Sequence, residues 1–368
     1  MTTIETKAVH TSQSEERKIQ PKVMPIYQSS AFTFSSLEEL EGYYEGNGTY
    51  LYSRTANPNT DALGQTVADL EGAPKGVSAS SGTSAILAGI LSVVKSGDHI
   101  LAAEDVYGGT FLLLKQELAL IGIQVHFADF SNISAVESFL IDYPEIKLIF
   151  SESITNPFLR LEDMEALSQF KKHYGVRVMI DNTFATPYTM KPYESGADLI
   201  AHSATKYLGG HSDVTAGILV GDAKLISAAE NRIVNMGLNL SPFEAWLTIR
   251  GIKTLALRMK AQTENAQAIA EFLRTKTNVW YPEKGAIVTL EIPENIDVSV
   301  FFTSLGWIKI VPTLAGVETT VSYPYGTSHR ALSEEEKQKV GVTRRIVRLS
   351  AGIEGKDDIL AQLAGAFN

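Results

Sequence analysis

A lysine and two hydroxyl side chains follow a short apolar segment near the middle of the chain. Residues 199–202 form this segment, and the next stretch, 203–211, reads Ser-Ala-Thr-Lys-Tyr-Leu-Gly-Gly-His. A lysine at the end of a buried strand must be paired or deprotonated, and a desolvated lysine with a lowered pKa is the nucleophile of Schiff-base chemistry. An ordinary surface lysine is the alternative, so Lys206 by itself leaves both interpretations open.

A carboxylate follows a second apolar segment earlier in the chain. Residues 178–180 read Val-Met-Ile, and Asp181, Asn182 and Thr183 come next. A lone aspartate in this position is usually a turn or cap residue. A lysine and a carboxylate together are the two protein groups that pyridoxal phosphate needs, because the lysine holds the aldehyde and the carboxylate keeps the ring nitrogen protonated. The pair of Lys206 and Asp181 therefore points to such a site.

Two turns rich in small residues could hold the remaining parts of the cofactor. Gly82 and Thr83 lie between a predicted strand and a predicted helix, where backbone N–H groups can bind a phosphate. Tyr107, followed by Gly-Gly-Thr, offers an aromatic face suited to stacking on a flat ring. Each of these segments, taken alone, is more often an ordinary turn.

The elements that must position these residues alternate along the chain from residue 60 onward. Short apolar and β-branched runs predict strands at 76–79, 99–103, 124–127, 147–151, 176–180, 199–202 and 216–220. Amphipathic stretches between them have the length of crossover helices, for example 84–94, 111–121 and 163–174. This alternation predicts an α/β fold with a mostly parallel sheet, in which ligands bind outside the carboxyl ends of the strands.

The C-terminal part of the chain predicts a smaller α+β domain. Ser241, Pro242 and Glu244 match the start of a helix, and the apolar pattern continues to about residue 273 as one long helix. Further strands are predicted at 286–291, 308–311 and 346–350, and a last helix at 356–366. The predicted division is an N-terminal arm (1–59), a large domain (60–240) and a small domain (241–368). The arm has few periodic signals, so we expect it to contact a neighbouring subunit.

Composition argues against several functional classes. The 368 residues carry 32 Lys and Arg against 42 Asp and Glu, a net charge of −10, so we expect no nucleic-acid partner. The absence of cysteine excludes disulfides and thiolate metal sites, and the seven histidines are scattered, so we expect no metal. The longest uncharged run, 76–94, is too rich in Ser and Gly for a membrane span, and the first residues predict no targeting signal. We therefore expect a cytoplasmic protein without a membrane anchor.

Several motifs together resemble the Cys/Met-metabolism (transsulfuration) family of pyridoxal-phosphate enzymes. The matching segments are 203–211, Asp181-Asn-Thr-Phe, Tyr52-Ser-Arg54-x-x-Asn-Pro and Arg348-x-Ser-x-Gly-Ile-Glu. The resemblance extends from about residue 27 to residue 352. It implies the fold-type I, aminotransferase-like architecture and a homotetramer built from dimers that share active sites.

The resemblance also implies how pyridoxal 5'-phosphate would be held. Lys206 would carry the cofactor and later move protons on the substrate, Asp181 would pair with the ring nitrogen, and Tyr107 would stack on the ring and assist proton transfer. The residues implied as phosphate ligands are Gly82, Thr83, Ser203 and Thr205, with Tyr52 and Arg54 of a neighbouring subunit.

The remaining implied roles concern the ring hydroxyl and the substrate. Asn156 and Thr183 would lie near the ring hydroxyl, and Asn156 would also border the substrate. Arg348 would clamp the substrate α-carboxylate in the two-pronged geometry that a guanidinium allows. Thr313, where the family usually has a serine, would lie beside the substrate.

Two departures from the family motifs bear on the reaction. Leu112 stands where many of these enzymes have an arginine, and Pro312 stands where they have a glutamate. Both changes predict a more apolar distal pocket. The short stretch between 282 and 285, with 242–247 and 327–329, most resembles bacterial cystathionine γ-synthase/O-acetylhomoserine thiol-lyase.

The resemblance leaves more than one reaction open. The leading hypothesis is γ-replacement on an O-acylhomoserine, in which cysteine gives cystathionine or sulfide gives homocysteine. The alternative is elimination from cystathionine or methionine, as in a cystathionine β- or γ-lyase or a methionine γ-lyase, which releases ammonia and a keto acid. A noncatalytic protein that keeps the fold is a third hypothesis, and the joint presence of Lys206, Asp181, Arg54 and Arg348 argues against it.

Overall fold

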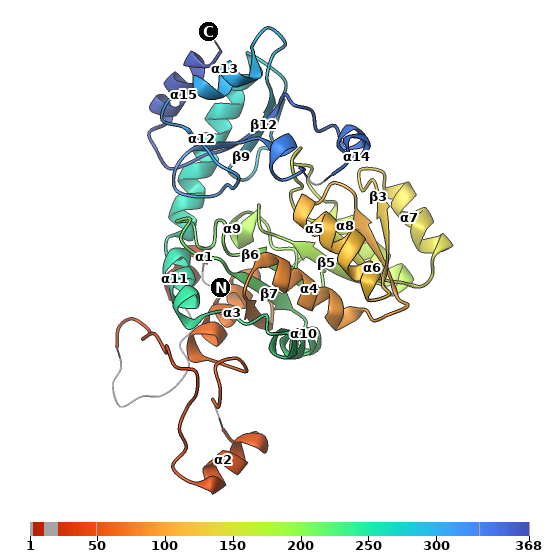
Figure 1. The fold of residues 1–368 in the computed structure, drawn as a ribbon, viewed down its shortest axis with the longest axis vertical. Helices are drawn as coiled ribbons and strands as arrows, with labels where there is room; N and C mark the ends of the chain where they lie inside the picture. The colour runs from red at the N-terminus through yellow and green to blue at the C-terminus, as the bar shows by residue number, and fades with distance from the viewer. Residues whose placement is uncertain (1–2, 11–20, 49, 331, 368) are drawn as a thin grey trace.

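Seven strands form a large sheet in the first two-thirds of the chain, and five shorter strands form a second sheet near the C-terminus (Figure 1). The computed structural model describes residues 3–10, 21–48, 50–330 and 332–367. The large sheet has the order β1-β7-β6-β5-β4-β2-β3. Its strands are β1 (Lys75–Ala79), β2 (His99–Ala103), β3 (Gln124–Ala128), β4 (Ile146–Glu152), β5 (Arg177–Asp181), β6 (Leu199–Ser203) and β7 (Gly217–Gly221). All seven predicted strands are present, and the fold class is confirmed.

One strand departs from the parallel arrangement. β7 runs antiparallel to both β6 and β1, while the pairs that join β6, β5, β4, β2 and β3 are parallel. Parallel neighbours need a long crossover, whereas antiparallel neighbours can be joined by a loop. The connection from β6 to β7 is such a loop, residues 204–216, and it contains Lys206. The return strand therefore keeps the lysine at the carboxyl end of β6.

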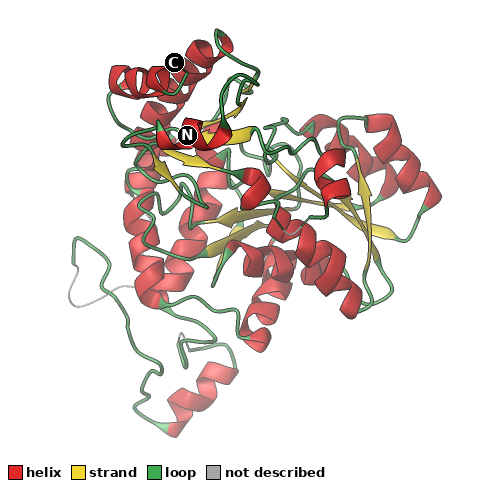
Figure 2. Cartoon of the chain, turned by 45° about the horizontal axis from the view of Figure 1, so that its top comes forward, coloured by secondary structure: helices red, strands yellow, loops and turns green. Residues whose placement is uncertain are grey.

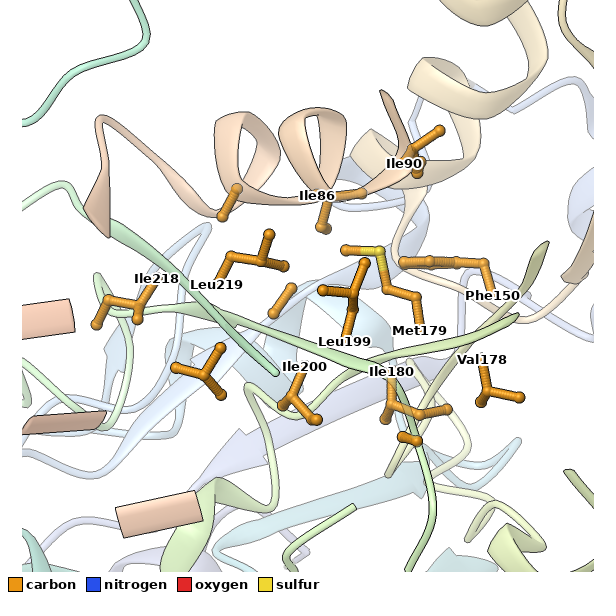
Figure 3. Close-up of a cluster of buried hydrophobic side chains, with 14 of the residues drawn as sticks. Ile86, Ile90, Phe150, Val178, Met179, Ile180, Leu199, Ile200, Ile218 and Leu219 are labelled. Carbon is orange, nitrogen blue, oxygen red and sulfur yellow. The ribbon is translucent and has the colours of Figure 1, made fainter. Parts of the chain in front are cut away.

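Helices cover both faces of the large sheet. On one face α4 (Gly82–Val93) packs on β6 and β7 and contacts α10 (Ala223–Met236), while α3 (Pro58–Glu71) packs on β1 and β7 from the other. Figure 3 shows the consequence for the core, since Met179, Leu199 and Leu219 point toward Ile86 of α4 and Ile180 points away. The remaining helices of this part are α5 (Gly108–Leu112), α6 (Leu118–Leu120), α7 (Ile133–Asp142), α8 (Met164–Tyr174) and α9 (Thr186–Thr189), with a π-helical turn at Leu113–Glu117.

The C-terminal part is an α+β unit around the second sheet. The sheet has the order β10-β11-β12-β9-β8, with β8 (Val279–Trp280), β9 (Ile287–Glu291), β10 (Lys309–Ile310), β11 (Thr320–Ser322) and β12 (Ile346–Ser350). The helices are α11 (Pro242–Ile252), α12 (Leu255–Arg274), α13 (Val298–Thr303), α14 (Glu334–Lys339) and α15 (Lys356–Gly365), with a 3-10 turn at Pro324–Gly326. The predicted strands and the last helix of this region are present, whereas β8, β11, α13 and α14 were not predicted.

The prediction of a single helix from 241 to about 273 is wrong, because α11 ends at Ile252 and α12 begins at Leu255. The carbonyl of Gly251 accepts hydrogen bonds from the backbone N–H and the hydroxyl of Thr254 and from Nη2 of Arg258. These donors occupy the carbonyl that would accept from the backbone N–H of Leu255 in a continuous helix, so the helix ends there. Nη1 of Arg258 also donates to the carbonyl of Tyr207, which ties the break to the lysine loop.

The N-terminal segment contains two short helices that the sequence did not predict, α1 (Ile4–Val9) and α2 (Leu37–Tyr44). The segment with α2 extends away from the rest of the chain (Figures 1 and 2). Parts of the predicted arm, residues 1–2, 11–20 and 49, lie outside the described residues. None of the helices that the structure describes is long and apolar enough to cross a membrane.

Candidate active site

A cavity opens at the carboxyl ends of β4, β5 and β6, and loops of the C-terminal part close its other side. It brings together residues that lie far apart in the sequence. The predicted site residues that line it are Gly82, Thr83, Tyr107, Asn156, Asp181, Thr183, Ser203, Thr205, Lys206, Thr313 and Arg348. Tyr52 and Arg54 are the two predicted site residues that do not line it.

Lys206 lies inside this cavity, on the loop that follows β6. Its Nζ donates a hydrogen bond to Oγ1 of Thr313 at 2.6 Å. Burial, and secondarily the nearby charge of Arg348, lowers the pKa of Lys206 to about 8. A lysine with this pKa is partly neutral near neutral pH, so it can act as a nucleophile and as a base.

Asp181 ends β5 and is oriented by its neighbour. The backbone N–H and the hydroxyl of Thr183 both donate to Oδ1 of Asp181, at 2.9 and 2.5 Å. Burial raises the pKa of Asp181, and the hydrogen bonds from Thr183 act against this rise. The Thr183 hydroxyl also accepts from the backbone N–H of Ser203 at 2.8 Å. The other oxygen, Oδ2, receives neither of these bonds, so it can face a cationic ring nitrogen.

A helix N-terminus and two hydroxyl side chains form the third part of the site. Ser81 caps α4, and Gly82 and Thr83 are its first residues. A Cβ atom on Gly82 would lie 2.7 Å from the Cβ of Ser203, and one on Gly217 would lie 1.9 Å from the carbonyl oxygen of Ser81. Only glycine lets the helix end approach the strands this closely. The result is a cradle of backbone N–H groups beside the hydroxyls of Ser203 and Thr205, which suits a phosphate.

Arg348 reaches the cavity from β12 of the second sheet. Its Nη1 donates to Oδ1 of Asn156, and its Nε donates to Oγ of Ser322 at 3.1 Å. Burial lowers the pKa of Arg348 to about 10, which leaves the guanidinium charged at neutral pH. Within the described residues Nη2 makes no hydrogen bond. The buried guanidinium is thus held in place and can still bind a carboxylate.

Tyr107 stands at the start of α5 and is 44% exposed. Its backbone N–H donates to Oε1 of Glu152 at 2.7 Å. Glu152 also lines the cavity, and the sequence analysis missed it. The sequence pattern that points to Asp181 also points to Glu152, because Glu152 ends the apolar strand β4 in the same way that Asp181 ends β5.

The other lining residues are mostly apolar or neutral. They are Ser81, Ile86, Thr110, Ile154, Phe184, Pro312, Leu314 and Ser328. Pro312 therefore lies where the departure from the family motif predicted an apolar wall. Leu112, the other departure, does not line the cavity.

Tyr52 and Arg54 belong to a different region. Tyr52 is 44% exposed. Nη1 of Arg54 donates to the carbonyl of Val234 at 3.1 Å, and Arg54 lines a second cavity between the N-terminal segment, β1 and α10. In a single chain these residues do not join the lysine site, so their action on a neighbouring subunit stays a prediction.

A buried polar network lies on the opposite face of the same strand ends. Oε1 of Glu71 lies 2.9 Å from Nε2 of His202 and accepts a hydrogen bond from Nδ2 of Asn182 at 2.7 Å. Asn182 follows Asp181 and His202 precedes Ser203, and alternate residues of a strand point to opposite faces. The sequence analysis missed this network, which holds the ends of β5 and β6 from behind.

These groups provide what a pyridoxal phosphate requires of a protein. An amine that can be neutral, an ionisable carboxyl group and an anion cradle converge in one cavity, with an aromatic side chain at its edge. The buried guanidinium on the far side adds a place for a substrate carboxylate. No group of three or more potential metal-ligating side chains is found in the described parts of the chain.

Known proteins are similar to this chain in both sequence and fold. A cystathionine beta-lyase of Lactococcus lactis is 36% identical, and the alignment covers 100% of this chain and 99% of that protein. A cystathionine gamma-synthase/O-acetylhomoserine (thiol)-lyase of Bacillus subtilis is 35% identical, with 99% and 96% covered. The structure of a cystathionine gamma synthase from Xanthomonas oryzae in complex with cystathionine has a TM-score of 0.93 at 32% identity, with 100% and 98% covered.

The model of one protein family spans almost the whole chain. The family is described as Cys/Met metabolism PLP-dependent enzyme, and its model matches residues 5–368. The match includes every segment on which the sequence resemblance rests, and the fold is the fold-type I architecture shared with the solved relatives. The chain therefore belongs to the Cys/Met metabolism family of enzymes that depend on pyridoxal 5'-phosphate.

Proposed function

We propose that this enzyme catalyses γ-replacement on an O-acylhomoserine, with cysteine or sulfide as the sulfur donor. The observation that carries the proposal is one cavity in which Lys206 lies opposite Arg348 and beside an apolar wall. A substrate whose α-carboxylate binds Arg348 would place its Cα and Cβ in the cavity that Lys206 also lines. The amine of Lys206 can then take a proton from Cα and afterwards one from Cβ.

The residues that would hold pyridoxal 5'-phosphate all line the lysine cavity. Lys206 would attach the aldehyde, Asp181 would pair with the ring nitrogen, and Tyr107 would stack on the ring. Gly82, Thr83, Ser203 and Thr205 would bind the phosphate. When bound, the cofactor supplies an electron sink for negative charge on the substrate carbon next to the amine.

The protein groups then divide the work of the reaction. Arg348 binds and orients the substrate carboxylate, and Nζ of Lys206 takes the protons from Cα and Cβ. The bond between Cγ and the acyloxy oxygen breaks with its electron pair on the leaving carboxylate. The sulfur donor forms the new bond to Cγ and gives its proton to the leaving carboxylate, and Nζ of Lys206 returns the two protons to Cβ and Cα. Thr313 accepts a hydrogen bond from Nζ and so positions the amine for each transfer.

The apolar wall of the cavity favours this substrate class. Ile154, Phe184 and Leu314 line the pocket, and Pro312 replaces a glutamate of the family motif. Lys206 and Arg348 are the only Lys and Arg residues that line this cavity in the described part of the chain. A neutral acyl group suits such a wall, because it carries no charge that would need a partner there.

A second candidate is elimination from cystathionine or methionine. The 36% identity to the cystathionine beta-lyase of Lactococcus lactis favours it, because that relative is as similar as the synthase-type relatives are. The same lysine, aspartate and arginine would serve this reaction. The products distinguish the two, since elimination releases a keto acid and ammonia.

Product analysis tests the proposal directly. The purified protein, loaded with pyridoxal 5'-phosphate, is given O-acetylhomoserine or O-succinylhomoserine with cysteine or sulfide, and in separate reactions cystathionine or methionine alone. We expect cystathionine or homocysteine as the main product of the first set. A keto acid as the main product from cystathionine alone, with no replacement product, would establish elimination instead.

We also propose that the enzyme is a homotetramer in which two subunits share each active site. Three observations support this proposal. Tyr52 is exposed, Arg54 does not line the lysine cavity of its own chain, and the N-terminal segment extends away from the rest of the chain. In this arrangement both residues would reach the phosphate of a neighbouring subunit. The molar mass in solution, measured by light scattering, tests the oligomeric state.

A further inference from the structure

Glu152 is a carboxyl group in the cavity to which the proposed reaction assigns no role. It ends β4, and its partner in the parallel register of β4 and β5 is Asp181. Residues paired across neighbouring strands point to the same face of the sheet. Both carboxyl groups accordingly line the same cavity, and Glu152 is only 5% exposed. Two acidic side chains thus lie side by side in a buried site.

The surroundings of Glu152 oppose a negative charge on it. Burial and then the charge of Asp181 raise the pKa of Glu152 well above its usual value, and Asp105 adds to the rise. Arg160 acts in the other direction, but it is engaged by Asp105 and Glu162 at 2.9 and 3.0 Å. Among the described residues Glu152 forms no ion pair. Like charges this close in a buried site favour one ionised and one neutral carboxyl group.

Hydrogen bonding indicates which of the two keeps the charge. Asp181 receives two hydrogen bonds from Thr183, and the nearby His202 also lowers the pKa of Asp181. Glu152 receives one, from the backbone N–H of Tyr107, and this bond ends on Oε1. Oε2 has no hydrogen-bond partner within the described part of the chain. Donors stabilise a carboxylate, so the better-supplied Asp181 is the ionised member of the pair.

We propose that Glu152 is a neutral carboxylic acid that positions Tyr107 through Oε1 and offers the proton on Oε2 to a polar group of the ligand. This inference deepens the proposed function and rests on it, because Tyr107 and Asp181 act there on the bound cofactor. The site then presents one ionised carboxylate, not two, to a single cationic ring nitrogen. Glu152 is a positioning residue in this arrangement.

Infrared difference spectroscopy tests the protonation state without reference to turnover. The spectrum of Glu152→Gln is subtracted from that of the unchanged holoenzyme at neutral pH. We expect the C=O stretching band of a protonated carboxylic acid in the difference. The matched control is Glu162→Gln, because Glu162 is equally buried but forms an ion pair with Arg160 at 3.0 Å. That variant should leave the band in place, and a difference spectrum of Glu152→Gln without the band overturns the proposal.

Cofactor retention provides a second measurement. Glutamine has the shape of a neutral glutamic acid and keeps both an acceptor for Tyr107 and a donor, so Glu152→Gln should bind pyridoxal 5'-phosphate within about twofold of the original affinity. Glu152→Ala removes the hydrogen-bond acceptor of the Tyr107 N–H and should bind pyridoxal 5'-phosphate roughly tenfold more weakly. Equal losses in the two variants overturn the proposal.

These outcomes separate the inference from the proposed function. If the unchanged protein binds no pyridoxal 5'-phosphate, the proposed function fails, and the infrared band, then recorded on the cofactor-free protein, still decides the state of Glu152. If the cofactor binds but the band is absent, the inference alone fails.

Discussion

The lysine cavity and the N-terminal segment differ in how completely one chain builds them. In the cavity, Arg348 is buried, Lys206 and Asp181 are half-buried, and each is held by at least one side-chain hydrogen bond. In the N-terminal segment, Tyr52 is exposed and Arg54 has a hydrogen bond to a single backbone carbonyl. A group that is already oriented loses little freedom when a ligand binds, whereas an exposed side chain must be ordered at that moment. The comparison indicates that one chain positions the reacting groups, whereas the completion of the phosphate site by a second chain stays a prediction.

Replacement of the lysine should have the largest effect on the cavity. Lys206→Ala removes both the attachment point and the base, so we expect turnover to fall by at least about a thousandfold. The cofactor absorption should change, and borohydride should no longer trap a pyridoxyl group on the peptide that contains residue 206. The exposed Lys224, replaced by alanine, is the control and should keep full activity. Normal turnover by Lys206→Ala would show that the reacting amine lies elsewhere.

Replacement of the buried guanidinium should affect substrate more than cofactor. Arg348→Ala removes a charge-assisted contact to the α-carboxylate, so we expect KM for the amino-acid substrate to rise by roughly a hundredfold while cofactor content stays near normal. Steady-state kinetics and the absorption spectrum measure the two quantities. An unchanged KM would exclude Arg348 as the carboxylate clamp.

Replacement in the N-terminal segment tests whether the sites are shared. Arg54→Ala should weaken cofactor binding by roughly tenfold, since one charged hydrogen-bond donor to the phosphate is lost. If sites are shared, Arg54→Ala and Lys206→Ala subunits complement one another. At a pyridoxal 5'-phosphate concentration too low to fill the Arg54→Ala sites, a refolded equal mixture should recover about a quarter of the original activity. Arg232→Ala, an arginine of α10 that also donates to a single backbone carbonyl, is the control for Arg54→Ala. A mixture that is no more active than its components would show that each site is built from one chain.

The smallest predicted effect of a substitution is that of Thr313→Val, which acts on the amine of Lys206. In the cofactor-free protein the amine is neutral above its pKa of about 8 and charged below it. The rate at which this protein captures pyridoxal 5'-phosphate should therefore rise with pH and level off above about 8. Thr313→Val removes the hydrogen-bond acceptor of Nζ and should slow capture by only a few-fold. A rate that is independent of pH between about 7 and about 9, roughly one unit on either side of this pKa, would contradict the lowered pKa.

Local pattern predicted most of the large sheet and the main reactive groups. Each predicted strand of that sheet lies within one residue of its observed bounds, because apolar runs and turn residues are short-range signals. Lys206 and Asp181 could be found for the same reason, since both follow apolar runs directly. The helix break after Ile252 could not be found from apolar periodicity, because it depends on side-chain hydrogen bonds from Thr254 and Arg258 to the carbonyl of Gly251.

The sequence by itself determined the type of sheet, the strand ends that carry the lysine and the aspartate, and the family to which these motifs belong. Only the tertiary structure decided that β7 runs antiparallel, that Thr313 lies against Lys206 and that Glu152 stands beside Asp181. The physical reason is that periodicity reports the conformation of neighbouring residues, whereas strand register and side-chain partners depend on packing between distant segments.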